Sequence, residues 1–554
     1  MFLIFMLGKV RFVRLIARQK DQKTRVILAL MNETYSLLKE STLSIEEQLV
    51  RAYQLTVDLQ KANDVLTEEN RKLLEENRRL QEKLQLAQHR QFGKKSEVGE
   101  DIAPEGDAPI TIPAHTRRKK TKGRLIDTSH LPRYQVFHDL PDNQKICTCC
   151  QQALTPIGED VSEQIEILPQ RLFVEEHVRY KYACRQCESV VMSPKEPAPI
   201  PKSMAGAGLL AEVILNKYHY HLPLYRQSKI FATYHAIIPD NTLGNWVMQT
   251  GTGLMPIYDV LWEVILSDGY LQVDETPITI LNPNKKGYLW AYYAPHIGKG
   301  LVIFELALTR KGAVAEDRLK TFKGALQTDG YGGYEKTRQR KDIEGIGCLT
   351  HARRKFDEVL KITKNKEGIS AQMIERLKPL YGLEAVMREK NCSFDERKRL
   401  RQEIALPILN QIHAWLIEIQ PEVLPKSQLG AAIQYTLNQW PYISQYVNNG
   451  MAEIDTNGVE NKIRDIAVGR RNWLFMGNQD SGSVHALFYS LILSAISHQL
   501  NPRIYIHYLI TQIHAIRRKE IDPKQLLPHT INHELLTAFA KEQFDKAKNL
   551  IGTA

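Results

Sequence analysis

The chain has 554 residues, of which 43% are hydrophobic, so it is expected to fold around about three or four hydrophobic cores. Its net charge of +11 favours an acidic polymer as partner, although a merely basic soluble protein would carry the same charge. Seven cysteines are too few for a disulfide framework, and five of them crowd into 147–187, as metal-binding thiols do in a reducing compartment, which predicts a cytoplasmic protein. No stretch approaches 18 uncharged apolar residues, so no transmembrane helix and no membrane partner are expected.

The first elements are an N-terminal extension, 1–44, and a helix over 45–92 with a seven-residue repeat. Leucine recurs at the d positions, with asparagine at matching a positions: Leu59, Leu66, Leu73 and Leu80, with Asn63, Asn70 and Asn77. This pattern predicts a parallel two-stranded coiled coil and hence a homodimer, because asparagines pair across the seam in register. The alternative is a single solvated helix.

A flexible basic linker is predicted over 93–130. It contains "RRKKTKGR", 117–124, with six basic residues in eight, beginning with Arg117, Arg118, Lys119 and Lys120. Such an arm can bind DNA phosphates without reading sequence, although such a run also solvates itself.

Two CxxC pairs dominate the stretch 131–200, with 33 residues between Cys150 and Cys184. The pairs "CTCC" and "CRQC" predict a structural, tetrahedral Zn²⁺ site with these ligands: Cys147, Cys150, Cys184 and Cys187. Cys149 is a possible substitute ligand. A redox dithiol is the alternative, but it leaves the second pair unexplained.

Residues 201–265 have helical periodicity, interrupted at "IIPDNT", where Asp240 or Asn241 is able to cap the next helix. In a basic protein, two helices joined by such a turn are compatible with a helix-turn-helix that binds DNA. A plain helical linker is the alternative.

A strand series follows: "LQVDETPITI", "GYLWAYYA", "LVIFELAL" and "GALQTDGYGGY". The first three have no helix between them and predict an antiparallel meander, while the fourth is expected to end at Asp329. Asp274 and Asp329 thus both lie on strands among apolar neighbours. "GYGG" lacks the lysine and hydroxyl of a phosphate loop and predicts a turn.

A third carboxylate, Glu460, lies in "DTNGVENKIRDIAVGRRNWLF", where Asn457 is expected to cap a helix that places Arg464 and Arg471 on the face of Glu460. A surface ion pair is the ordinary interpretation of that spacing. Two aspartates with a glutamate also suit hard cations, and two Mg²⁺ or Mn²⁺ ions about 4 Å apart assist in-line displacement at phosphorus.

The order of the zipper, "RQFGKKSE", the CxxC pairs, "HLPLYRQ", "VDETP", "TDGYGGY", "HARRKF" and "GRRNWLF" resembles the IS66 family of bacterial insertion-sequence transposases, from about residue 45 to 510. The resemblance implies a multidomain α+β protein whose RNase H-like core, a mixed sheet with helices, carries a DDE triad. The triad maps onto Asp274, Asp329 and Glu460. The core spans 266–345 and 451–500, interrupted by an all-helical insertion, 346–450, and followed by a C-terminal helical tail, 501–554.

The same resemblance implies that His351 of "CLTHARRKF" lies near the scissile phosphate. The alternative is that His351 has a purely structural role. Strand parity sets Glu275 with Leu271 and Val273 and turns Asp274 to the other face. The resemblance selects Asp274 as the metal ligand and leaves Glu275 without a task. Two positions depart from the family pattern: Asn461 stands where arginine is common, and Tyr220 where aspartate is common.

The resulting expectation is a DDE transposase that binds terminal inverted repeats and target DNA and acts at the nucleoid, with accessory proteins of the same element as further partners. The DNA contacts are expected from the basic arm and from Arg464, Arg470 and Arg471. The alternatives are a non-catalytic, zinc-dependent DNA-binding regulator and a general RNase H-like nuclease.

Overall fold

The computed structural model describes residues 201–552 continuously, together with 172–183, 190–195, 197–200, Gln152 and scattered positions between Gln54 and Gln81. Contacts divide the chain into two units, Met1–Lys94 with His177–Ala554, and Lys95–Glu176. The architecture below belongs to the first unit. The four cysteines predicted to bind zinc, Cys149 and the basic arm, 117–124, lie outside the described residues.

Every described position between Gln54 and Gln81 is helical, as the repeat predicts. Leu73 and Leu80 are exposed on this helix, and Glu68 pairs with Arg71 at 2.8 Å. Pairing of two such helices stays a prediction. Further along, β1 (Lys181–Ala183) and β2 (Val190–Met192) form an antiparallel ladder on either side of "CRQC".

The helical periodicity of 201–265 is confirmed, but this described stretch forms three helices rather than two: α4 (Ala207–Tyr218), α5 (Leu224–Thr233) and α6 (Asp240–Leu266). Helix α6 begins at the predicted break, but its N-cap is Pro239 and no side chain caps it. Its apolar residues are buried at helical spacing, Leu243, Val247 and Leu254 among them.

A mixed sheet forms the centre of this unit. The predicted meander is confirmed: β3 (Tyr270–Asn282), β4 (Lys285–Ala294) and β5 (Leu301–Ala307) pair antiparallel in sequence. The strands β6 (Gly324–Gln327) and β7 (Ile343–Ile346) then add in parallel, giving the order β5-β4-β3-β6-β7. The short strand β8 (Met476–Asn478) pairs in parallel with the far end of β3.

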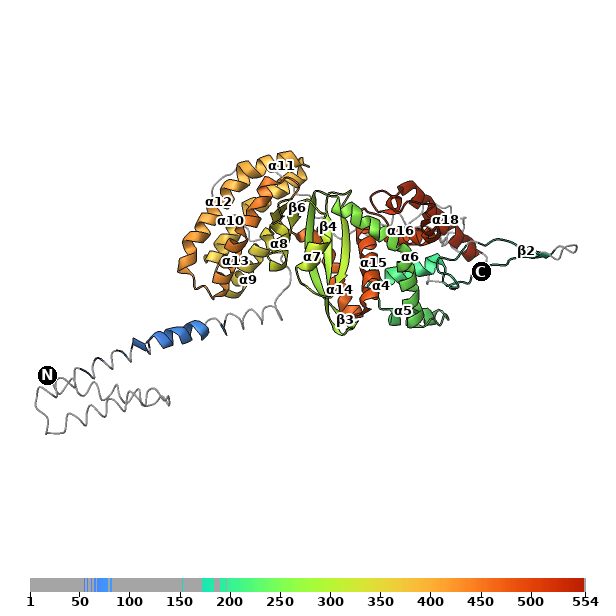
Figure 1. Ribbon diagram of the computed structural model, residues 1–554, viewed down its shortest axis with the longest axis horizontal. Helices are drawn as coiled ribbons and strands as arrows, with labels where there is room; N and C mark the ends of the chain where they lie inside the picture. Colours follow the sequence, from blue (N-terminus) through green and yellow to red (C-terminus); the bar gives the residue numbers. More distant parts are fainter. Residues whose placement is uncertain are drawn as a thin grey trace, which may run out of the picture. The chain divides into compact units, whose positions relative to one another are not determined.

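Short elements connect the strands: α7 (Ala313–Arg318), the 3-10 turn η2 (Gly332–Tyr334) and α8 (Glu335–Arg338). Two longer helices, α14 (Asn457–Trp473) and α15 (Gln479–Ser497), pack on the strands (Figure 1). The N–H groups of Val302 and Phe304 on the edge strand β5 donate to the hydroxyls of Ser494 and Ser490, at 3.0 and 2.9 Å. Helix α15 therefore satisfies an edge that would otherwise expose unpaired backbone groups.

The chain between β7 and α14 forms a helical bundle, 349–448. Its elements are α9 (Leu349–Thr363), α10 (Ile369–Glu389), α11 (Phe394–Leu400), the π-helix η3 (Arg401–Ala405), α12 (Leu406–Ile419), η4 (Gln420–Glu422), α13 (Gln428–Ile443) and η5 (Ser444–Asn448). Figure 1 shows these helices grouped together. Their apolar core, with Phe356, Leu377 and Leu409, is continuous with Tyr270 and Ala325 of the sheet.

The C-terminal part contains α16 (Pro502–Thr511), α17 (Ile513–Arg517), η6 (Pro523–Leu526) and α18 (His533–Gly552). Helix α16 packs on α4 and α18, so the first helix before the sheet contacts the C-terminal helices. Within the described part of the chain, no helix combines the length and apolar character that crossing a membrane requires.

Candidate active site

The register of two parallel strands brings Asp274 and Asp329 together. Gln272 of β3 lies opposite Gln327 of β6, and its Nε2 donates to the Oε1 of Gln327 at 3.1 Å, so these side chains share a face. The two aspartates follow two residues later in each chain segment, Asp274 still within β3 and Asp329 just after the end of β6.

Asp274 also lies at an open position of the sheet. Among the described residues, the edge of β3 opposite β4 is paired with β6 as far as Gln272 and with β8 from Ile280 onward. The stretch between them has no strand on that side. It contains Pro277, which lacks the N–H that such pairing would need. The gap leaves room beside Asp274.

Asp329 is placed differently from the prediction, because β6 ends at Gln327 and Asp329 stands two residues beyond it. Its Oδ1 accepts the N–H of Tyr331 at 2.9 Å, so the carboxylate fixes the turn that "GYGG" forms. The glycine is required here, because a Cβ on Gly330 would lie 2.7 Å from the Tyr435 ring of the bundle.

Helix α14 is seated on β3 by Gln272. The Oε1 of Gln272 accepts the N–H of Val459 at 3.1 Å, and its Nε2 donates to the carbonyl of Asp455 at 2.9 Å. A Cβ on Gly458 would lie 2.6 Å from that Oε1, so glycine permits the close approach. The first turn of α14, which carries Glu460, is thereby held against the sheet.

Asn457 was expected to cap α14 but is its first helical residue. The carboxylate of Asp455, two residues earlier, accepts the N–H of Asn457 at 3.1 Å and its side-chain N–H at 2.9 Å. Asp455 therefore accepts a free N–H group at the start of α14, the role that was predicted for the side chain of Asn457.

Electrostatics show that the three acids share one region. Burial raises the pKa of Asp274 to about 7, and the negative charges of Glu275, Asp329 and Glu460 contribute to that rise. The charges of the three predicted acids therefore interact, whereas the group whose ligand atoms lie within 4.8 Å of one another, among the described residues, is Cys348, His351 and Glu460. Carboxylate oxygens are the donors that Mg²⁺ or Mn²⁺ prefers.

Glu460 has three neighbours besides the aspartates. Its Oε2 lies 2.7 Å from Nη2 of Arg354, and its Oε1 accepts the hydroxyl of Thr456 at 3.3 Å. Nδ1 of His351 lies 3.8 Å from Oε1 and has no hydrogen-bond partner among the described atoms. His351 and Arg354 are one turn apart on α9, so the predicted histidine does lie beside the predicted glutamate.

Cys348, immediately before α9, lies close to His351 and Glu460. Its Sγ accepts the N–H of Thr456 at 3.3 Å, and burial raises the pKa of the thiol to about 12. Ligand atoms of Cys348, His351 and Glu460 lie within 4.8 Å of one another. Because the thiol stays protonated at neutral pH, its contact with Thr456 is best understood as support for the start of α14.

Glu275 has a structural role. Its side chain is 1% exposed, its Oε1 accepts from Nε of Arg310 at 2.6 Å, and its Oε2 accepts the hydroxyl of Tyr334. Burial raises its pKa, and both partners oppose that rise. Two adjacent carboxylates therefore differ in task, as strand parity predicted, and the task of Glu275 is a buried ion pair.

The predicted DNA-binding arginines of α14 have different surroundings. Arg464 and Arg471 are exposed. Arg470 donates to the hydroxyl of Thr276 at 3.2 Å and to the carbonyl of Pro277. Arg470 therefore donates hydrogen bonds to oxygens of β3 that have no strand partner at its open edge.

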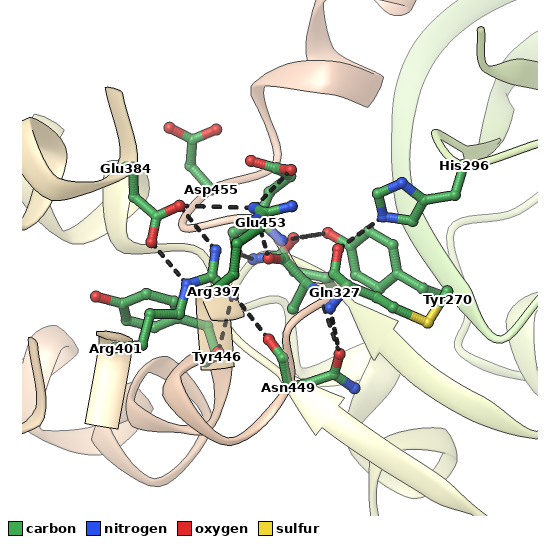
Figure 2. A network of polar contacts seen from close by, with 12 residues as sticks. Tyr270, His296, Gln327, Glu384, Arg397, Arg401, Tyr446, Asn449, Glu453 and Asp455 are labelled. Atoms are coloured by element: carbon green, nitrogen blue, oxygen red, sulfur yellow. Dashed lines mark hydrogen bonds and ion pairs between the residues drawn. The ribbon is translucent and has the colours of Figure 1, made fainter. Parts of the chain in front are cut away.

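A buried network ties the segment before α14 to the sheet (Figure 2). The hydroxyl of Tyr270 accepts the N–H of Glu453 at 3.0 Å and donates to Oε1 of Gln327. Nε2 of Gln327 in turn donates to the carbonyl of Glu453 at 2.8 Å. The sequence analysis did not identify Gln272, Gln327 or Arg354 as site residues. The available signal was a polar glutamine within an apolar strand for the first two, and the basic motif "HARRKF" for Arg354.

The same segment is tied to the bundle. The carboxylate of Glu453 lies 2.9 Å from Nη2 of Arg397, which lies 3.6 Å from Glu384. Glu384 and Arg401 form a bidentate pair with both distances 2.7 Å, and Nη1 of Arg401 donates to the carbonyl of Asn449 at 2.7 Å. The strap 449–456 thus bonds with the bundle on one side and the sheet on the other.

Comparison with known proteins gives two family matches. Residues 202–484 match a family described as "Transposase IS66 family", and residues 144–188 match the "zinc-finger binding domain of transposase IS66". Among curated proteins of Sinorhizobium fredii (strain NBRC 101917 / NGR234), the "Uncharacterized protein y4jD" is 33% identical over 430 residues, which cover 74% of this chain and 83% of the relative. The "Uncharacterized protein y4hP" of the same organism is 28% identical over 458 residues, covering 79% and 82%.

Proposed function

The chain belongs to the IS66 family of transposases, and from this premise we propose that it is a DDE transposase. It binds the terminal inverted repeats of its element, cuts DNA at the element's ends and joins them to target DNA. The observation that carries the proposal is that Asp329, just after β6, and Glu460, on α14, lie close enough for their charges to act on the carboxylate of Asp274 at the open edge of β3.

The topology supports an RNase H-like core as the frame of this site. Three antiparallel strands are followed by two strands parallel to the first, and the third acid comes from a helix after the sheet. The bundle between β7 and α14 then corresponds to the expected insertion, 346–450, and the core comprises 266–345 and 451–500.

Asp274, Asp329 and Glu460 would hold two Mg²⁺ or Mn²⁺ ions. When bound, the ions activate the attacking oxygen and neutralise the leaving oxygen at phosphorus. Water attacks first and releases a 3′-hydroxyl at the element's end, which then attacks a target phosphate. One P–O bond forms and one breaks at each step, so no covalent protein intermediate is needed.

The protein's own groups orient these reactants. Gln272 and Thr456 hold the turn that presents Glu460, and Asp329 stays in place through the N–H of Tyr331. His351, with its Nδ1 3.8 Å from Oε1 of Glu460, would contact the scissile phosphate. The exposed Arg464 and Arg471 extend the site along α14 toward the DNA backbone.

The remaining segments are proposed to recognise the ends. The zinc-finger match over 144–188 supports a structural Zn²⁺, with these four ligands: Cys147, Cys150, Cys184 and Cys187. The basic arm and helices α4 to α6 would add DNA contacts. The zipper would pair two protomers at the nucleoid, so that both ends of the element are cut together.

Of the alternatives, a non-catalytic regulator gives no reason for three carboxylates to gather at a strand edge. A general nuclease with the same core differs in its substrate. It would cut DNA without the element's ends as well as DNA that carries them.

The test is strand transfer by the full-length protein with Mg²⁺ and labelled element-end DNA. Asp274→Asn and Asp329→Asn are expected to lower the rate by about 100-fold or more, because each removes a metal ligand. Asp317→Asn is the control, since Asp317 is an exposed aspartate of α7. Equal rates for wild type and the two site variants would refute the proposal, and equal cleavage of unrelated DNA would favour the nuclease.

A further inference from the structure

Arg354 neutralises a carboxylate that the proposed reaction needs for metal binding. The guanidinium approaches Oε2 of Glu460 to 2.7 Å from α9, one turn after His351. While this pair is closed, one of the two oxygens of Glu460 is engaged by a cation of the protein itself. A divalent ion at the three acids would compete with Arg354 for that oxygen and repel its charge.

The ion pair between Arg354 and Glu460 can separate without burying an unpaired charge. The side chains of Arg354 and Glu460 are 33% and 19% exposed, so water can solvate both charges when they separate. The neighbouring pair of Arg310 with Glu275 is the opposite case, because Glu275 is 1% exposed and its charge would be left buried. Of these two arginines, Arg354 is therefore the one that can change partner.

A released guanidinium at this place has an evident ligand. Its planar fork matches two oxygens of a phosphate, and the acids beside it would no longer attract it once a divalent ion balances their charge. We propose that Arg354 is a phosphate-binding residue of the active site, which Glu460 retains until a divalent ion binds and which then engages the DNA. This inference rests on the proposed function, since it takes Asp274, Asp329 and Glu460 as metal ligands.

The first experiment measures Mn²⁺ binding to the full-length protein without DNA, from the electron paramagnetic resonance signal of free Mn²⁺. Arg354→Gln is expected to bind Mn²⁺ about 3- to 10-fold more tightly than wild type, because a competing cation is removed. Arg353→Gln is the matched control. It removes the same charge from the same helix, but its guanidinium lies over the ring of Tyr381, at 5.5 Å.

The second experiment measures affinity for element-end DNA by fluorescence anisotropy, with Ca²⁺ and with no divalent ion. Arg354→Gln is expected to lose about 5- to 10-fold in affinity with Ca²⁺ and to match wild type without it. Arg353→Gln should change by the same factor in both conditions. Arg354→Lys keeps the charge and loses the fork, so it should retain the wild-type Mn²⁺ affinity and still bind DNA less tightly with Ca²⁺.

The outcomes separate this inference from the function on which it rests. The inference is overturned if Arg354→Gln binds Mn²⁺ no more tightly than wild type, or if its loss of DNA affinity is the same with and without Ca²⁺. The proposed function survives either result as long as Asp274→Asn abolishes Mn²⁺ binding. Unchanged Mn²⁺ binding by Asp274→Asn would remove both.

Discussion

At the scale of single residues, Asp274 and Glu275 show how one strand separates two acids. Burial and the charges of Glu275, Asp329 and Glu460 raise the pKa of Asp274 to about 7. Glu275 is held by Arg310 and Tyr334. Glu275 thus has a cation from the protein, whereas the carboxylate of Asp274 lies within reach of three other negative charges.

Replacing Glu275 by glutamine should destabilise the protein. The free energy of unfolding is expected to fall by about 1–2 kcal/mol, because the charge-assisted hydrogen bonds from Arg310 and Tyr334 weaken, while the guanidinium of Arg310, 43% exposed, stays solvated. Urea denaturation measures the change. Glu316→Gln is the control, since its pair with Lys336 at 3.8 Å is on the surface, and a loss as large there would contradict this explanation.

At the scale of elements, the position of Glu460 depends on contacts of α14 at both ends. Gln272 and Gly458 fix its first turn against β3, and Arg470 in its last turn bonds to the oxygens of Thr276 and Pro277. The helix thus bridges the open edge of the strand that carries Asp274. The spacing between helix and strand determines how far Glu460 lies from the two aspartates.

Gly458→Ala should therefore impair catalysis through geometry. The new Cβ would lie 2.6 Å from Oε1 of Gln272 and 2.8 Å from Cε1 of Tyr293, so α14 must shift. We expect a loss of about 1–3 kcal/mol in unfolding free energy and a lower strand-transfer rate at unchanged DNA affinity. Gly332→Ala, with open space among the described atoms, is the control. An unchanged transfer rate in Gly458→Ala would show that this approach does not position Glu460.

Helix α4 carries a lysine that opposes stability at neutral pH. Burial lowers the pKa of Lys217 to about 8. An unfolded chain keeps this proton up to pH about 10.4, so it binds more protons than the folded protein between these values, and stability rises with pH across that window. His485, whose buried imidazole is close enough to interact, has a pKa well below its usual value and is neutral there.

Lys217→Met should raise the free energy of unfolding at pH 7 by about 1–3 kcal/mol and remove the rise between pH 8 and 10. Thermal or urea unfolding at several pH values measures both effects. Lys229→Met on the exposed side of α5 should keep the wild-type pH profile. The same rise in Lys217→Met as in wild type would contradict this role of Lys217.

At the scale of the whole described unit, the strap 449–456 makes the bundle and the sheet depend on each other. Glu384 and Arg401 are 1% and 0% exposed, and they hold the strap through Arg397 and the carbonyl of Asn449 (Figure 2). The strap continues directly into α14. Side chains of the bundle therefore hold the segment that leads directly to the helix of the third acid.

Glu384→Gln should test that dependence. Loss of the carboxylate leaves the guanidinium of Arg401 buried without its partner, which costs about 3–5 kcal/mol. We expect weaker Mn²⁺ binding as well, because the strap positions Glu460. Glu375→Gln on the same helix is the control, since its pair with Lys378 has both side chains 65% exposed. Unfolding of the bundle in a separate transition, with Mn²⁺ binding intact, would show that the two parts are independent.

Local patterns in the sequence were sufficient for much of this protein. Alternation and the lack of intervening helices predicted the meander of β3, β4 and β5, and periodicity predicted helical structure over 201–265 with the break before α6. Parity separated Asp274 from Glu275 before any partner was visible. Those features depend on residues close in the chain, where side-chain spacing alone determines the outcome. The zinc ligands, the basic arm and the pairing of the zipper stay predictions.

Other features were decided only by tertiary structure. The parallel pairing of β3 with β6, 55 residues apart at Gln272 and Gln327, places Asp329 beyond a strand end and beside Asp274. The pairing of Arg354 with Glu460 joins residues 106 positions apart, which no local pattern encodes. Partners of buried charges are chosen by proximity in the folded chain, because a charge out of water must find an opposite charge wherever packing places one. The sequence, through its resemblance to a family, therefore predicted which acids form the site, and the fold determined what surrounds them.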